Sequence, residues 1–253
     1  QKADKDSKIY FICDEKNSYD VLKINTKDIS DDLIKSILEI NYFNNEENPL
    51  WNTSLLRIFY LYNAAKYLNL KSFIHFDLDV LTYESYENLK YKFIENKFNI
   101  TPQSEKTLIF GYSFIDGIEN FEKICKNIYE ILQNYSFYEN LYNKGRKLNE
   151  MMILNIAYIE NPNYFNLLKT IPNEVENIIF DGSSYGQYLG GIDKKRFSKR
   201  EINVSQYAGR AMIEMGYRPK MKSNGPIIEY GGKIYKIANL HIHKKNLSNF
   251  LLS

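Results

Sequence analysis

The sequence predicts a single α/β domain over residues 1–253, with a mostly parallel sheet flanked by helices and a loop-rich C-terminal third. Short apolar runs at 8–13 and 73–76 have the composition of buried strands, and an acid follows each of them. Between these runs, apolar residues recur at helical spacing from 55 to 68. Strand, helix and strand with polar groups at the strand ends is the doubly wound pattern, in which ligands bind where strands terminate.

The other elements follow in order along the chain. Apolar spacing predicts helices at 29–40, 55–68, 121–132 and 149–159, with Asn52, Thr53 or Ser54 as the cap of the second. Apolar runs predict further strands at 106–110, 178–180 and 234–243. Polar or glycine-containing stretches predict loops at 41–49, 111–117, 181–191 and 219–232. Because 149–159 is apolar on almost every side, we expect that helix to be buried.

Composition excludes several classes of protein. The formal net charge is only +2 and no block of like charge occurs, so no nucleic-acid partner is indicated. The two cysteines, Cys13 and Cys125, lie in apolar segments and predict neither a disulfide framework nor a zinc site. No uncharged apolar run reaches the ~18 residues of a membrane span, and the first residues lack the apolar core of a signal peptide. We therefore expect a soluble, cytoplasmic chain.

Two acids, Asp77 and Asp79, follow the strand predicted at 73–76. If that strand continues through them, their side chains share one face and lie roughly 7 Å apart. Mg²⁺ and Mn²⁺ take such oxygen ligands, with substrate phosphates completing the shell. A turn-forming role is the alternative for an acid at a strand end. The buried approach and the second acid favour the metal-linked interpretation.

A second cluster lies near the C-terminus, where Asn239, His241 and His243 alternate with apolar residues and precede Lys244 and Lys245. On a strand, the three polar side chains would share one face. The alternative interpretation is a polar strand face that lies in solvent and has no ligand. Together with the acid pair, however, imidazole and carboxylate can complete a mixed Mn²⁺ shell, while a lysine neutralises phosphate.

Four further polar residues are candidates for the same site. Glu150 begins the apolar helix, where the helix dipole favours an anion, and it serves either as a proton acceptor or only as a terminal carboxylate. Asp181 enters a glycine-containing loop and is either a ligand contact or a turn acid. Arg57 either reaches a nucleotide or phosphate or lies in solvent. Asp14 either accepts hydrogen bonds from a base or ribose or only forms a turn.

The order of these motifs resembles the GT-A fold of nucleotide-sugar-dependent glycosyltransferases, and especially a microbial and viral group of them. The resemblance spans the chain from about residue 51 onward. Its motifs are the stretches WNTSLLRIFYL (51–61), FDLDV (76–80), FDGSSYGQYLGGID (180–193) and NLHIHKK (239–245). That group reads HIHSK where this chain has HIHKK, which leaves open which lysine meets phosphate.

The resemblance implies a role for each matching residue. Asp79 would ligate Mn²⁺ or Mg²⁺, and Asp77 would contact the sugar, the ribose or a metal-bound water. His241 or His243 would complete the protein's metal ligands, and Lys244 or Lys245 would hold the diphosphate. Glu150 would face the acceptor hydroxyl, and Asp181 and Gln187 would line the sugar.

The activity that this resemblance implies is transfer of a sugar from a UDP- or GDP-linked donor to a hydroxyl of a glycan or other acceptor. A cation and a lysine would stabilise the leaving diphosphate. Glu150 would accept the hydroxyl proton if the reaction inverts the anomeric centre, whereas Asp181 or Gln187 would stabilise the sugar if it retains it.

Two other classes compete with the transferase. A haloacid-dehalogenase-type phosphatase would use Asp77 as nucleophile and Asp79 as general acid. That class needs a later acid pair, and the chain has no Asp-Asp or Gly-Asp-x-x-x-Asp downstream. A non-catalytic module that only binds a sugar nucleotide is the second alternative.

Overall fold

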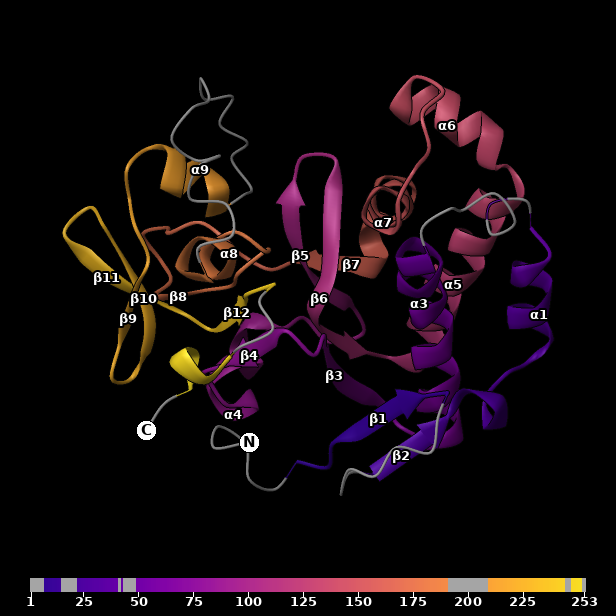
Figure 1. Ribbon diagram of the computed structural model, residues 1–253, viewed down its shortest axis with the longest axis horizontal. Coiled ribbons are helices and arrows are strands. Elements are labelled where there is room, and N and C mark those ends of the chain that lie inside the picture. Colours follow the sequence, from indigo (N-terminus) through magenta and orange to yellow (C-terminus); the bar gives the residue numbers. More distant parts are fainter. Residues whose placement is uncertain are drawn as a thin grey trace.

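The computed structural model describes residues 7–14, 22–40, 42, 49–190, 209–243 and 247–251, which form a mixed α/β fold (Figure 1). The elements of the first half are β1 (Tyr10–Cys13), β2 (Leu22–Asn25), α1 (Asp32–Leu38), α3 (Pro49–Tyr67), β3 (Ser72–Phe76), β4 (Val80–Thr82), α4 (Tyr86–Leu89), β5 (Phe98–Ser104) and β6 (Thr107–Asp116). Those of the second half are α5 (Ile118–Gln133), α6 (Tyr135–Asn143), α7 (Glu150–Glu160), β7 (Phe165–Leu167), β8 (Ile178–Ile179), α8 (Tyr185–Gly190), α9 (Gly209–Glu214), β9 (Lys220–Lys222), β10 (Gly225–Tyr230), β11 (Lys233–Ile237) and β12 (Asn239–His241).

One four-stranded sheet has the order β3-β6-β5-β7 and carries the main core. Helices α3, α5 and α7 pack beside it (Figure 1), and their apolar residues merge with those of β5 and β6 in one cluster. Leu55, Ile58 and Phe59 of α3 belong to this cluster, as their helical spacing predicts. Helix α7 is largely buried, which confirms the expectation from its uniform apolarity.

A second four-stranded sheet, ordered β8-β11-β10-β9, forms the other side of the structure, with β4 and β12 paired between the two sheets (Figure 1). Its core includes Ile179, Tyr185, Ile237, Leu240 and Ile242. Within the described part of the chain, strand β1 pairs only with β2, in parallel and separately from both larger sheets. The β4–β12 pair therefore joins a segment of the first half of the chain to one near the C-terminus.

The strand directions of the main sheet differ from those predicted. Strands β3 and β5 both run antiparallel to β6, and only β5 and β7 are parallel. The described residues therefore do not form the mostly parallel sheet that the sequence predicts. The error arose because β6 continues to Asp116 through residues read as a loop, and because β5 was not assigned at all. Asn99 and Pro102 lower the strand propensity of β5, but burial on both faces overrides it.

Other differences occur at element ends. Helix α3 begins at Pro49, so Asn52, Thr53 and Ser54 lie inside it and do not cap it. The loop predicted at 181–191 contains α8, and the stretch at 219–232 contains β9 and β10. The strand predicted at 234–243 divides into β11 and β12.

The β10–β11 hairpin shows a signal that the sequence contained. Gly231 and Gly232 join the two strands, and both have positive φ, of 56° and 75°. A Gly-Gly pair between strands is typical of a tight two-residue hairpin, because that turn requires φ angles that glycine adopts without strain.

Both cysteines are free. No helix among the described residues is long and apolar enough to cross a bilayer.

Candidate metal centre and the adjoining acids

A turn, not a strand face, presents the two acids. Strand β3 ends at Phe76, the Asp77 amide donates to the carbonyl of Gly111 (2.9 Å), and the Val80 amide donates back to the carbonyl of Asp77 (3.0 Å). The prediction that Asp77 and Asp79 share one strand face is therefore wrong. The turn directs their carboxylates toward different partners, and of the two acids only Asp79 groups with His241 and His243.

Pairing between β4 and β12 brings the distant histidines to Asp79. His241 lies opposite Val80 in this antiparallel pair, and the amide of Ile242 donates to the carbonyl of Asp79 (3.0 Å). Because Asp79 immediately precedes β4 and His243 closely follows β12, the ladder places these ends together. The tertiary structure thus joins the two clusters that the sequence singled out.

Asp79, His241 and His243 each offer a ligand atom within 4.8 Å of the others. His241 Nε2 lies 3.1 Å from Asp79 Oδ1 and 2.9 Å from His243 Nε2. Adjacent ligands of an octahedral ion with bonds of about 2.1 Å are about 3 Å apart, so this spacing suits a shared cation. His241 is buried whereas His243 is exposed, which leaves an open side for water or substrate. A set of two imidazoles and one carboxylate suits Mn²⁺ and also Fe²⁺.

The charge states of these side chains favour metal binding. Burial opposes ionisation of Asp79, but His241 and His243 offset it and lower the pKa of the carboxyl. Burial lowers the pKa of His243, and the neighbouring His241 lowers it further. A carboxylate and a neutral imidazole are the forms that coordinate cations.

Two residues with strained backbone conformations meet at this group. Ser183 and His243 both adopt left-handed conformations, with φ of 66° and 55°. Ser183 Oγ lies 3.3 Å from His243 Nε2, so two unfavourable backbone conformations meet in one contact. Such strain commonly marks functional sites, because surrounding structure must hold it in place. The sequence analysis did not single out Ser183.

Gly111 allows His241 to take its position. A Cβ atom at Gly111 would lie 2.6 Å from His241 Nδ1. The sequence analysis interpreted this glycine as part of a loop, whereas it lies inside β6. Glycine within a strand often marks the close approach of another group, and that signal was present in the sequence.

Arg57 connects Asp77 with Glu150. Its Nη1 atom forms an ion pair with Asp77, and its Nη2 atom lies 3.0 Å from Glu150 Oε1. The guanidinium also lies over the ring of Phe110. Arg57 is therefore engaged by protein carboxylates, which differs from both the phosphate-binding and the solvated interpretations. Asp77 lies outside the group of three possible metal ligands.

The two acids bound to Arg57 have opposite pKa shifts. Burial raises the pKa of Glu150 to about 7, against the lowering effect of Arg57. Burial also works against ionisation of Asp77, but His75 and Arg57 outweigh it and hold the pKa at about 2. His75 Nε2 lies 3.4 Å from Asp77 Oδ1, and burial lowers the pKa of this histidine. No role was predicted for His75 from the sequence, although it precedes Asp77 by two residues.

Asp181 is engaged by backbone amides. Its Oδ1 accepts from Ser184 (2.7 Å) and Tyr185 (2.9 Å), and its Oδ2 accepts from Gly186 (2.8 Å) and His241 (2.9 Å). The carboxylate therefore caps α8 and fixes the backbone of β12 at His241. This geometry favours the turn-acid alternative for Asp181, and its contact with a sugar stays a prediction.

The remaining predicted residues are Gln187, Asp14 and the two lysines after His243. Gln187 contacts His243, with 3.0 Å between Nε2 and Nδ1. Asp14 is exposed at the end of β1 and accepts a hydrogen bond from Thr26, with no contact to the metal group among the described residues. Lys244 and Lys245 lie outside the described residues.

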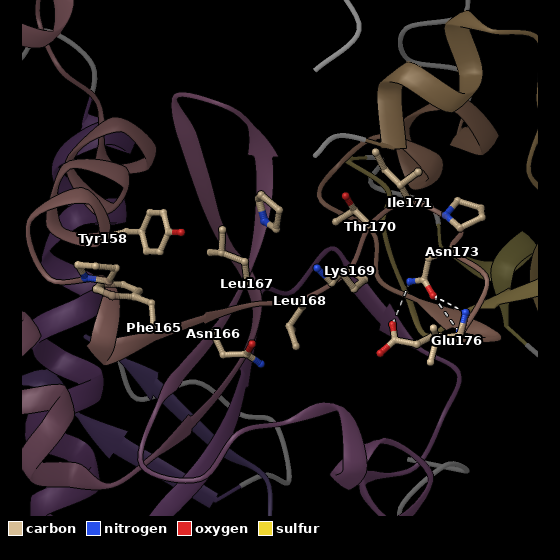
Figure 2. Close-up of a pocket in the computed structure, with 14 residues that line it drawn as sticks. Tyr158, Phe165, Asn166, Leu167, Leu168, Lys169, Thr170, Ile171, Asn173 and Glu176 are labelled. Carbon is tan, nitrogen blue, oxygen red and sulfur yellow. Dashed lines mark hydrogen bonds between the residues drawn. The ribbon is translucent and has the colours of Figure 1, made fainter. Parts of the chain in front are cut away.

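A separate pocket of about 800 Å³ lies beside β7 and the segment that follows it (Figure 2). Tyr158, Phe165, Leu167, Ile171 and Glu176 are among its lining residues. None of the predicted site residues lines it, so the chemistry expected from the sequence lies elsewhere.

Fold and site together define a mixed α/β protein with a two-histidine, one-carboxylate group. No family model and no curated protein sequence matches this chain. Among solved structures, the chain is similar to the apo form of mouse xyloside xylosyltransferase 1, with a TM-score of 0.40 and 9% identity over 59% of this chain and 62% of that one. This neighbour is a glycosyltransferase, but the likeness is partial, so the proposal below rests on the site.

Proposed function

We propose that the protein is a metal-dependent glycosyltransferase, which moves a sugar from a UDP- or GDP-linked donor to a hydroxyl of a glycan or other acceptor. The observation that carries the proposal is the union of Asp79 with His241 and His243 in one metal-compatible group. The motif order that resembles GT-A glycosyltransferases supports the same interpretation.

The metal group suits the leaving diphosphate. A Mn²⁺ or Mg²⁺ ion held by Asp79, His241 and His243 would offset the negative charge that develops on the departing nucleoside diphosphate. Lys244 and Lys245 follow His243 directly in the sequence. They stay our proposed phosphate contacts, because a lysine adds positive charge beside the same leaving group.

Glu150 is the proposed proton acceptor for an inverting reaction. A pKa of about 7 makes the group a usable base at neutral pH, since the carboxylate is present and still binds a proton well. Arg57 holds the side chain in place through the 3.0 Å ion pair. For a retaining reaction, we prefer Gln187 to Asp181 as the stabilising group, because backbone amides occupy both oxygens of Asp181.

The phosphatase alternative receives less support from the geometry. It requires Asp77 as a nucleophile, but an Asp77 oxygen is paired with Arg57, and Asp77 lies outside the metal group.

The decisive experiment incubates the protein with Mn²⁺ and a panel of sugar nucleotides, and measures release of UDP or GDP with and without chelator. Chelator-sensitive release, increased by a hydroxyl acceptor, is the expected result. Hydrolysis of simple phosphate esters with no effect of sugar nucleotides would indicate the phosphatase. Nucleotide binding without turnover would indicate a binding module, and turnover that requires Fe²⁺ and O₂ would overturn the proposal.

A further inference from the structure

One side chain outside the metal group contacts it through His243. Gln187 lies on α8, and its Nε2 is 2.8 Å from Ser183 Oγ and 3.0 Å from His243 Nδ1. On the other side of the same ring, His243 Nε2 lies 2.9 Å from His241 Nε2. Gln187 therefore touches the His243 nitrogen that faces away from the metal group.

This contact determines which ring nitrogen of His243 carries the hydrogen. A neutral imidazole carries one hydrogen, on either Nδ1 or Nε2. When Gln187 Nε2 donates to Nδ1, that nitrogen holds the lone pair and the hydrogen must be on Nε2. The Nε2 hydrogen then occupies the position from which a lone pair would coordinate a cation.

Metal coordination by His243 Nε2 requires the opposite tautomer. The hydrogen moves to Nδ1, which then needs an acceptor, and a 180° rotation of the Gln187 amide supplies Oε1 at the same place. Ser183 accommodates both orientations of the Gln187 amide, because its hydroxyl can accept from Gln187 Nε2 or donate to Gln187 Oε1. The net charge of the site does not change in this exchange.

We propose that Gln187 is a positioning residue whose amide orientation selects the metal-binding tautomer of His243, an inference that rests on the metal site of the proposed function. The contact between Ser183 and His243 supports it, because it joins two left-handed residues that the surrounding structure must hold in place.

Outer hydrogen bonds of this kind orient metal-ligating histidines and raise their basicity. Gln187 therefore acts on the cation through His243, and this role differs from the sugar contact expected from the sequence. This role explains why an amide occupies position 187, since an aliphatic side chain of similar length would supply neither the hydrogen-bond donor nor the acceptor.

Two variants test the proposal. Gln187→Met keeps the length but removes the acceptor, and should weaken Mn²⁺ binding about 10-fold in calorimetry. Gln187→Glu supplies a permanent acceptor and should retain binding. The second measurement needs no metal: two-bond ¹⁵N–¹H spectra report the tautomers of the 3 histidines at about pH 8.5. We expect Nε2–H for His243 in the parent and Nδ1–H in Gln187→Glu, with unchanged His75 signals.

The outcomes separate this inference from the proposed function. If the parent protein binds no Mn²⁺, the metal site fails, and the tautomer measurement alone decides the role of Gln187. An unchanged His243 tautomer in Gln187→Glu would overturn the inference. Equal Mn²⁺ affinity of Gln187→Met and a parent that binds the metal would overturn it as well. If Gln187→Met does not fold, judged by thermal melting, the spectrum of Gln187→Glu still gives the answer.

Discussion

His241 Nε2 lies 3.1 Å from Asp79 Oδ1, although the two residues are far apart in the sequence. The contact depends on the short antiparallel pair of β4 and β12, whose register places His241 opposite Val80. Five predictions follow from this relationship and from the residues around it.

Replacement of Asp79 by alanine should abolish metal-dependent nucleotide binding, because it removes the anionic ligand of the group. Calorimetric titration with nucleotide in the presence of Mn²⁺ measures this effect. Asp32→Asn is the matched control, since Asp32 is almost fully exposed on α1 and pairs with Lys35 there. Undiminished Mn²⁺-dependent binding by the Asp79 variant would count decisively against the site.

Glu150→Gln should spare nucleotide binding and reduce transfer by about 10²- to 10⁴-fold, as expected for loss of a general base. The base must be deprotonated, so the transfer rate of the parent should fall as the pH drops through about 7. The variant should lose this dependence. Equal activity of parent and variant would remove Glu150 from the mechanism.

Asp77 should make stability sensitive to acid. Its pKa is about 2 in the folded protein against an ordinary 3.8, so its contribution is complete above pH 3.8 and disappears as the pH falls toward 2. The contribution is about 2 kcal/mol. Urea unfolding at several pH values should show that Asp77→Asn costs most near neutrality and progressively less in acid. A cost that is independent of pH would contradict the assignment.

Gly111→Ala should weaken Mn²⁺ binding, because the new Cβ would lie 2.6 Å from His241 Nδ1 and displace the ring. Ser113→Ala on the same strand is a suitable control, since the Ser113 hydroxyl is buried without a hydrogen-bond partner among the described residues. We expect that control to be neutral or slightly stabilising. Calorimetry with Mn²⁺ compares the two variants, and equal affinities would show that His241 tolerates the added methyl group.

Asp181→Asn should destabilise the fold by about 3 kcal/mol, because the amide NH₂ cannot accept the backbone N–H groups that one carboxylate oxygen now binds. Chemical unfolding measures this loss. A variant of full stability with a raised KM for the sugar nucleotide would instead support the sugar contact expected from the sequence.

Much of the local structure could be predicted because its cause is local. The apolar stripe of α3, the apolar character of α7 and the strand before Asp77 were all identified from spacing alone. Asn149 caps α7, accepting from the amide of Met152 (3.0 Å), and places Glu150 in the first turn, as expected. Strand direction was less accessible, because it depends on which distant segment pairs with β6.

By itself, the sequence determined the chemistry available to this protein: the carboxylates of Asp77 and Asp79, the imidazoles of His241 and His243, and an acid at the start of α7. Only the tertiary structure decided their partners. The turn at Asp77 separates two acids that a straight strand would hold on one face, so that Asp77 pairs with Arg57 and Asp79 contacts His241. The physical reason is that side-chain spacing follows from local backbone geometry, whereas long-range contacts depend on strand pairing and burial across the whole chain.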